Sequence, residues 1–224
     1  MQKEGIDQRW IVFAVLVLLA GGAVAAILIT RGGGDSGEKS GAAGCREVEE
    51  PEPKTVSFKA PRQVLKKAEP ATAVVETSCG TFEIELATKE APKTANSFAF
   101  LADEGFYDDL SFHRIVPGFV IQGGDPEGTG LGGPGYKVDE KPPESLAYTK
   151  GVVAMAKSGA EPPGRSGSQF FVVTGADAGL PPEYALVGRV SKGMDVVERI
   201  GKLGTPQEKP KQPVVIKTIT VTEG

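Results

Sequence analysis

The stretch of sequence that decides the fold reads Phe112-His113-Arg114-Ile115-Val116-Pro117-Gly118-Phe119-Val120-Ile121-Gln122-Gly123-Gly124-Asp125. It places a histidine, an arginine and a glutamine among apolar residues that favour β-strands. Because side chains alternate between the faces of a strand, Val120 and Gln122 point away from the face that holds Ile121. The stretch Gly167-Ser168-Gln169-Phe170-Phe171-Val172 has the same character. Its alternation puts Gln169 and Phe171 on a common face, so outward groups can be separated from core positions.

The composition is ordinary for a globular protein. Of 224 residues, 40% are hydrophobic and 24% are charged. This length suggests one core domain with extra segments, or two small domains. The 30 glycines and 17 prolines indicate many turns. The net charge of −4 supplies no basic field, so we expect no nucleic-acid partner.

An apolar run without charged side chains covers residues 10–30. As a helix rising about 1.5 Å per residue, it would cross a bilayer core of ~30 Å. We therefore predict a transmembrane anchor that binds the membrane, after a short tail over residues 1–9. The alternative is a cleaved signal peptide with its cleavage site at Ala23-Val24-Ala25, although the apolar run continues past that site. Under either interpretation the rest of the chain is exported.

The two cysteines fit an exported protein. Cys45 follows the apolar run and Cys79 lies in the expected folded domain. An even number of cysteines in an oxidising compartment favours a disulfide, so we predict a Cys45–Cys79 bridge. The alternatives are two unpaired thiols, or a lipid on Cys45 after Ala43-Gly44, which lies far beyond the apolar run.

Residues 31–70 have the composition of a linker. They are rich in Gly, Ser, Glu, Lys and Pro, which bury little apolar area. Their more apolar part, Val56–Leu65, is expected to pack on the domain. The folded domain is predicted over residues 71–224.

Within this domain the periodicity predicts many short strands and two helices. Ala73–Thr77 and Phe82–Leu86 alternate in the way that strands do, with a turn between them. Pro92 suits the first turn of a helix that Gly105 ends, and a second helix is predicted over Met194–Ile200. Short apolar runs between glycine and proline loops make up the rest, which favours a mainly β barrel.

Several kinds of site are excluded by residue counts. The chain has one histidine, His113, and no Gly-x-Ser-x-Gly elbow, which disfavours a Ser–His–acid hydrolase. One histidine and two separated cysteines make no zinc ligand set. The string Gly128–Gly133 matches a dinucleotide motif, but Pro134 follows at once, where that motif requires a helix. We expect no metal and no cofactor.

The two quoted stretches resemble the cyclophilin family of peptidyl-prolyl isomerases, over about Ala71 to Thr222. Three further motifs occur in matching order: Gly151-Val152-Val153-Ala154-Met155-Ala156, Leu180-Pro181-Pro182-Glu183-Tyr184 and Val187-Gly188-Arg189-Val190. The resemblance implies a closed eight-stranded antiparallel β-barrel capped by two helices. Here the barrel would follow an N-terminal transmembrane helix and a linker, and we expect a monomer.

The resemblance also implies an activity, cis–trans isomerisation of X–Pro bonds in proline-containing polypeptides. With the N-terminal run, it predicts a bacterial enzyme anchored by a single span in the cell membrane, with its catalytic domain outside the cytoplasm. The secreted form is the alternative location. Its role would be to accelerate the folding of exported proteins. The alternative function is a proline-peptide-binding chaperone module with little turnover.

By resemblance, Arg114 is the catalytic residue, donating a hydrogen bond to the prolyl nitrogen of the twisted amide. The substrate-binding residues would be His113, Phe119, Val120, Gln122, Ala156, Lys157, Gln169, Phe171, Leu180 and Tyr184. Within this set we interpret His113 mainly as supporting structure. The chain departs from the family where Val120 replaces a frequent methionine, Lys157 a common asparagine and Tyr184 a frequent histidine. Gly179 stands where eukaryotic members often carry a tryptophan that contacts cyclosporin, so we expect weaker cyclosporin sensitivity.

Overall fold

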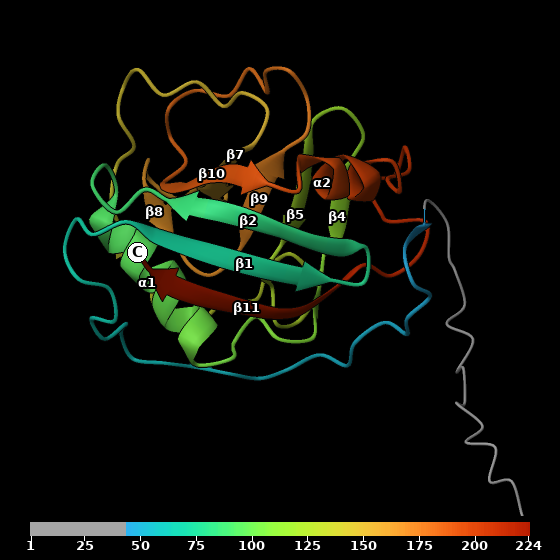
Figure 1. Ribbon diagram of the computed structural model, residues 1–224, viewed down its shortest axis with the longest axis horizontal. Helices are drawn as coiled ribbons and strands as arrows, with labels where there is room; N and C mark the ends of the chain where they lie inside the picture. Colours follow the sequence, from blue (N-terminus) through green and yellow to red (C-terminus); the bar gives the residue numbers. More distant parts are fainter. Residues whose placement is uncertain (1–43) are drawn as a thin grey trace, which may run out of the picture. The chain divides into compact units, whose positions relative to one another are not determined.

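The computed structural model describes residues 44–224, and its sheet is built outward from one hairpin (Figure 1). Strands β1 (Ala71–Thr77) and β2 (Gly80–Leu86) pair in antiparallel register. The apolar half of the alternating pattern in β2 is buried, namely Phe82, Ile84 and Leu86. Gly80 has a φ of 118°, a conformation that favours glycine at the hairpin turn.

Seven further strands extend the hairpin into one curled antiparallel sheet with the order β3-β11-β1-β2-β10-β7-β9-β5-β4. Their bounds are β3 (Leu110–Ser111), β4 (Arg114–Val116), β5 (Val120–Gly123), β7 (Val152–Met155), β9 (Phe170–Val173), β10 (Leu186–Lys192) and β11 (Val215–Glu223). A separate two-stranded sheet pairs β6 (Val138–Asp139) with β8 (Arg165–Ser166).

The predicted closed eight-stranded barrel is wrong in strand number and in closure. The main sheet of the described residues has nine strands, and its end strands β3 and β4 do not pair with each other. They are successive segments of the chain, separated only by Phe112 and His113. The chain therefore connects the two edges of the sheet directly, but no backbone hydrogen bonds pair β3 with β4. The mainly β fold with two helices is confirmed.

The two helices are α1 (Pro92–Asp103) and α2 (Met194–Gly201). Pro92 opens α1, where its missing N–H is not needed. No side chain caps α1 from the N-cap position; the Glu140 carboxylate instead accepts from the backbone N–H groups of Lys93 and Thr94 at 3.1 and 2.7 Å. Helix α1 packs on β10 and β11, and α2 packs beside β2, β4 and β5.

Two apolar clusters lie on either side of β4, β5 and β9. The larger cluster fills the inside of the sheet and contains Ile115, Ile121 and Phe170, all fully buried. Rings pack there edge to face, with Phe170 at 5.4 Å from Phe98 between centroids. The smaller cluster, around Val120, Tyr148, Val152, Ala154, Phe171 and Val173, lies on the outer side of the strands. The fold therefore leaves a second apolar surface outside its main core.

Residues 44–70 form an N-terminal arm without helix or strand of its own that lies along the domain. A disulfide joins Cys45 to Cys79, the pair expected from the sequence. The Phe58 ring packs edge to face on Phe100 at 5.3 Å, and Leu65 is buried in the main core. The apolar part of the expected linker thus packs on the domain, as predicted.

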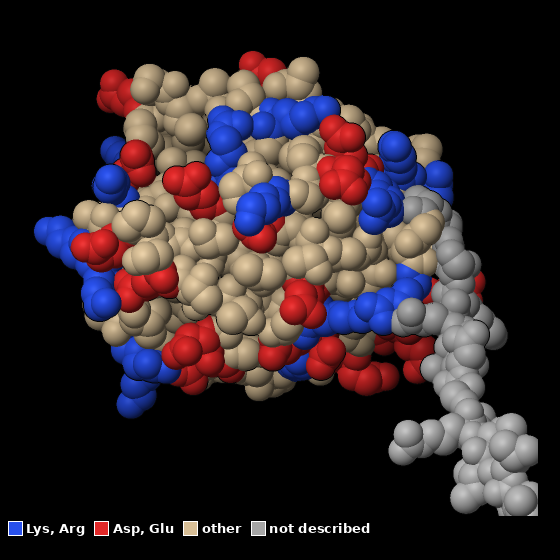
Figure 2. Space-filling model, in the orientation of Figure 1, with Lys and Arg blue, Asp and Glu red and all other residues tan. Residues whose placement is uncertain are grey.

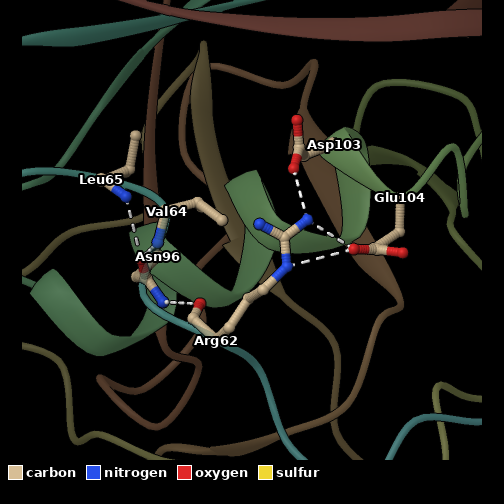
Figure 3. A network of polar contacts seen from close by, with 6 residues as sticks. All are labelled: Arg62, Val64, Leu65, Asn96, Asp103 and Glu104. Atoms are coloured by element: carbon tan, nitrogen blue, oxygen red, sulfur yellow. Dashed lines mark hydrogen bonds and ion pairs between the residues drawn. The ribbon is translucent and has the colours of Figure 1, made fainter.

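Asn96 of α1 fastens the end of this arm (Figure 3). Its Oδ1 accepts hydrogen bonds from the backbone N–H groups of Val64 and Leu65, at 2.9 and 3.1 Å. Its Nδ2 donates to the carbonyl of Arg62 at 2.9 Å, and the Arg62 guanidinium pairs with two carboxylates at the end of α1. One buried amide therefore satisfies three backbone groups of a segment that has no ladder of its own.

The predicted anchor, residues 10–30, lies outside the described residues. Between residues 44 and 224, neither helix has the length and apolar character needed to cross a membrane. On the face shown in Figure 2, basic and acidic side chains are interspersed over the described surface.

Candidate active site

A row of outward side chains crosses β4, β5 and β9. The register pairs Arg114 with Gln122, and Gln122 with Phe171. Opposite residues of neighbouring strands share a face, so this register brings the three predicted site residues side by side. The alternation predicted from the sequence therefore holds: Ile115 and Ile121 are fully buried inside, while Arg114 and Gln122 are only partly buried.

Hydrogen bonds connect this row. Arg114 Nη1 donates to Gln122 Oε1 at 3.2 Å, and Gln122 Nε2 donates to Gln169 Oε1 at 3.1 Å. Gln169 Nε2 in turn donates to the carbonyl of Gly132 at 2.9 Å. The amide oxygens of Gln122 and Gln169 thus accept and their amide nitrogens donate, which fixes the orientation of both side chains. Gln122 in turn holds one edge of the Arg114 guanidinium.

Glu208 holds a second edge of the Arg114 guanidinium. Arg114 Nε donates to Glu208 Oε2 at 2.7 Å, and this bond lowers the pKa of the Glu208 carboxyl. The Glu208 backbone is also tied to β4, because its carbonyl accepts from the N–H of Ile115 at 2.9 Å. Among residues 44–224, Nη2 of Arg114 has no partner, so its donors remain available to a ligand.

The predicted apolar residues of the site gather in the outer cluster. Val120 and Phe171 belong to its buried part, and the partly buried residues packed on it include Phe119, Ala156, Leu180 and Tyr184. The rings of Phe171 and Tyr184 meet edge to face at 5.5 Å. An apolar surface therefore lies directly beside the polar row.

Tyr148 completes the aromatic group and was not predicted from the sequence. Its ring lies 5.8 Å from Tyr184 and 6.1 Å from Phe171. It is fully buried, its hydroxyl donates to the carbonyl of Tyr184 at 2.6 Å, and the Tyr184 N–H donates back to it at 2.9 Å. Burial raises the pKa of Tyr148 to about 12. Tyr148 thus fixes the segment that carries Tyr184.

Lys157 also contacts Tyr184 and its neighbour Glu183. Its Nζ pairs with Glu183 at 3.2 Å and stands 5.5 Å from the centre of the Tyr184 ring. Only 5% of the side chain is exposed. A cavity of about 290 Å³ opens here, lined by Gly130, Leu131, Gly132, Lys137, Ala156, Lys157, Ser158, Glu161, Gly167, Ser168 and Gln169. The outer cluster, the polar row and this cavity together are called the groove below.

His113 is buried and joins none of these hydrogen bonds. It is 7% exposed, and both ring nitrogens lack a partner within residues 44–224. Burial lowers the pKa of His113, and the opposing effect of Asp125 is smaller. The ring is therefore neutral near pH 7. A direct contact of His113 with substrate stays a prediction.

Two other features of the described chain bear on the choice of site. No group of three or more His, Cys, Asp or Glu side chains within residues 44–224 is arranged to hold a metal ion. A cavity of about 1060 Å³ lies between arm residues 61–68 and α1, and none of the predicted site residues lines it. The groove combines hydrogen-bonding side chains with apolar ones.

Comparison with known families agrees with this geometry. The family described as "Cyclophilin type peptidyl-prolyl cis-trans isomerase/CLD" matches residues 72–221. The chain belongs to the cyclophilin family. The predicted class of enzyme, a peptidyl-prolyl cis–trans isomerase, is thereby confirmed. The match contains the whole groove and leaves out the N-terminal arm.

Individual cyclophilins match most of their own length. "Peptidyl-prolyl cis-trans isomerase-like 1" of Neurospora crassa is 44% identical over 155 residues, covering 66% of this chain and 93% of the relative. "Peptidyl-prolyl cis-trans isomerase ppi1" of Schizosaccharomyces pombe is 40% identical, covering 67% and 99%. A solved cyclophilin type isomerase from Cryptosporidium parvum superimposes with a TM-score of 0.63 at 33% identity, covering 69% of this chain and 99% of the other.

These comparisons correct the predicted location. A bacterial cell membrane protein with an extracytoplasmic catalytic domain was expected from the N-terminal run, and this prediction is wrong. The curated relatives reported above are fungal proteins, and nothing in their match to this cyclophilin supports a bacterial origin or a membrane anchor.

Proposed function

We propose that this cyclophilin isomerises X–Pro bonds by stabilising the twisted amide without covalent chemistry. Rotation about the bond faces a barrier of ~18–20 kcal/mol because the C–N bond has partial double-bond character. The cis and trans states differ by only about 0.5–1 kcal/mol for X–Pro, so the problem is one of rate. The reaction breaks no covalent bond, so neither a nucleophile nor an acid that transfers its proton is needed.

Arg114 is the group proposed to act on the bond. Twisting the amide restores the lone pair of the prolyl nitrogen, and a guanidinium beside that nitrogen can then donate a hydrogen bond to it. This bond is absent from both planar states, so it stabilises the transition state selectively. Because Gln122 and Glu208 already hold two edges of the guanidinium, little reorganisation is needed. Arginine also keeps its charge at every relevant pH.

The apolar part of the groove is proposed to hold the proline ring. Val120, Phe171 and Leu180 lie in the outer cluster with Phe119, and their surface is continuous with the aromatic pair at Tyr184. Gln122 would orient Arg114 or bind the peptide backbone, and its hydrogen bond to Arg114 supports the first role. Ala156, Lys157 and Gln169 would line the path of the peptide, since all three border the cavity.

One observation carries the proposal: a half-exposed arginine, held on two edges with free donors at Nη2, stands beside an apolar surface. A related solved structure was determined "in the presence of dipeptide ala-pro", with 30% identity to this chain and a TM-score of 0.63. That ligand is a proline peptide, which supports such peptides as substrates here. The prediction that clients are exported proteins depended on the membrane location and is not part of this proposal.

The test follows cis-to-trans conversion of a short X–Pro peptide. The unchanged protein should accelerate it, and Arg114→Ala should lower kcat/KM about 100-fold, the usual effect of removing a transition-state donor. Arg165→Ala is the matched control, because Arg165 pairs only with Asp139 on the small sheet and should keep full activity.

Two outcomes would reject the proposal. Conversion at the uncatalysed rate, with peptide still bound, would favour the alternative of a proline-peptide-binding chaperone module. Full activity in Arg114→Ala would reject the role of Arg114, because another group would then have to donate the hydrogen bond to the prolyl nitrogen.

A further inference from the structure

The loop over residues 126–135 forms one wall of the groove. The carbonyl of Gly132 accepts the hydrogen bond from Gln169 that ends the polar row. Gly130, Leu131 and Gly132 line the 290 Å³ cavity, and Leu131 is 91% exposed. The position of this loop therefore decides the shape of the groove beside Gln169.

This loop is poorly suited to hold its own shape. Five of its ten residues are glycine, and glycine loses more conformational freedom on ordering than any other residue. The buried carboxylate of Asp125 orders the first half by accepting from the N–H groups of Glu127 and Gly130. In the second half, the N–H of Leu131 donates to Thr129 Oγ1 at 3.1 Å, but no buried carboxylate takes part, so contacts from outside the loop help to hold it.

The N-terminal arm supplies such contacts at both ends of the loop. The N–H of Lys54 donates to the carbonyl of Pro126 at 2.8 Å, and the N–H of Phe58 donates to the carbonyl of Pro134 at 2.8 Å. Ser57 also lies so close to Gly135 that a Cβ there would come within 2.1 Å of the serine Oγ. The loop and the arm are thus fitted to each other.

The arm is itself fastened on both sides of these contacts. The disulfide between Cys45 and Cys79 holds it to the turn after β1, and the Phe58 ring is anchored on Phe100. The family match begins at residue 72, so the arm lies outside the matched part of the chain.

We propose that the arm is a positioning element for substrate binding, which holds the 126–135 loop in the conformation that accepts a peptide. This inference rests on the proposed function, because it concerns the same groove. Arg114 is carried by β4, and its hydrogen-bond partners Gln122 and Glu208 lie outside the arm in sequence. Loosening the arm should therefore weaken peptide binding and leave the rotation step unchanged.

The most direct test removes a single donor. Lys54→Pro eliminates the N–H that bonds to Pro126, whereas Lys54→Ala keeps that N–H. Both variants lose the side-chain contacts of Lys54 with the carbonyl of Asp108 and the carboxylate of Asp109, so the difference between them isolates the N–H. Lys54→Pro should raise KM for an X–Pro peptide about fivefold over Lys54→Ala, the usual effect of one lost hydrogen bond, with kcat unchanged. Equal KM values for the two variants would overturn the inference.

A second test releases the arm at its start. Reduction of the disulfide, or the double change Cys45→Ser and Cys79→Ser, should speed amide hydrogen exchange in residues 126–135 and raise KM. Reductant should have no further effect on the double variant. Arg62→Ala is the matched control, because it removes the ion pairs to Asp103 and Glu104 and the contact of the guanidinium with the Phe100 ring, but keeps the disulfide and the hydrogen bonds between the arm and the loop.

The outcomes separate this inference from the proposed function. Activity that depends on Arg114, together with unchanged loop exchange and KM in the arm variants, would overturn the positioning role alone. Absence of activity in the unchanged protein would overturn the proposed function. In that case faster loop exchange with weaker peptide binding, measured by calorimetry, would still support the positioning role.

Discussion

The inner and outer faces of β4, β5 and β9 differ in what their side chains contact. On the inside, Ile115, Ile121 and Phe170 are fully buried among apolar neighbours and carry no polar group. On the outside, Arg114 and Gln122 form hydrogen bonds along a partly solvated row. Side chains on the inner face therefore stabilise the fold, whereas those on the outer face make up the candidate site. Substitutions on the inner face should change mainly the free energy of unfolding, and those on the outer face mainly the kinetic constants.

The largest expected effect comes from two neighbouring phenylalanines on opposite faces. Phe170→Ala should lower the free energy of unfolding by about 3–5 kcal/mol, because it leaves a cavity in the main core. Phe171→Ala removes the same ring from the smaller outer cluster and should cost less stability, while raising KM for X–Pro peptides more. Chemical denaturation and peptide kinetics measure the two effects. Equal stability losses would contradict the separation of the faces.

Tyr148→Phe tests how the outer face is supported. The change keeps the ring and removes a hydroxyl that bonds twice to the backbone of Tyr184. The two partly buried backbone groups of Tyr184 lose their partner, which should cost about 1 kcal/mol of stability. KM should rise and kcat should stay, because Tyr184 is proposed to bind the peptide, whereas Arg114 is proposed to act on the bond. A fall in kcat alone would contradict this assignment.

His113 should make the stability of the folded protein depend on pH. Its pKa is lowered in the folded state by burial, so the folded protein binds this proton less readily than the unfolded chain. Stability is therefore complete above the ordinary histidine pKa of about 6.5 and falls as the pH drops through the lowered folded value. His113 is the single histidine of the chain, so His113→Gln should flatten thermal unfolding midpoints measured across this range. An unchanged pH profile would contradict a buried neutral ring.

Glu208→Gln should have the smallest effect. The pair of Glu208 with Arg114 is half exposed, and such pairs contribute little. The amide still accepts from Arg114 Nε, so kcat/KM should change less than about threefold, and high salt should reduce the difference. A large loss would show that the charge of Glu208, and not its position, matters to Arg114.

The sequence predicted the strands of this site better than their surroundings. Period-two alternation placed Gln122, Gln169 and Phe171 outward, because the pattern is local and each strand has one buried face. Glu208 could not be predicted, since it meets Arg114 across 94 residues. Tyr148 lies in a loop without periodicity. Whether β3 and β4 pair depends on backbone hydrogen bonding, which leaves no pattern in residue types.

The arm shows a related limit. Residues 44–70 have the composition of a linker, yet particular contacts hold them on the domain, among them one disulfide, the ring of Phe58, buried Leu65 and the amide of Asn96. Average composition cannot reveal such contacts.

Arg114 is proposed to act on the twisted amide and not on peptide binding. The most direct measurement is the rate of cis–trans interconversion of a bound X–Pro peptide by NMR exchange, together with its Kd, for the unchanged protein and Arg114→Lys. Lysine keeps the charge and loses the planar donor fork. We expect much slower interconversion on the variant at nearly unchanged Kd. Unchanged interconversion with a weakened Kd would contradict this expectation.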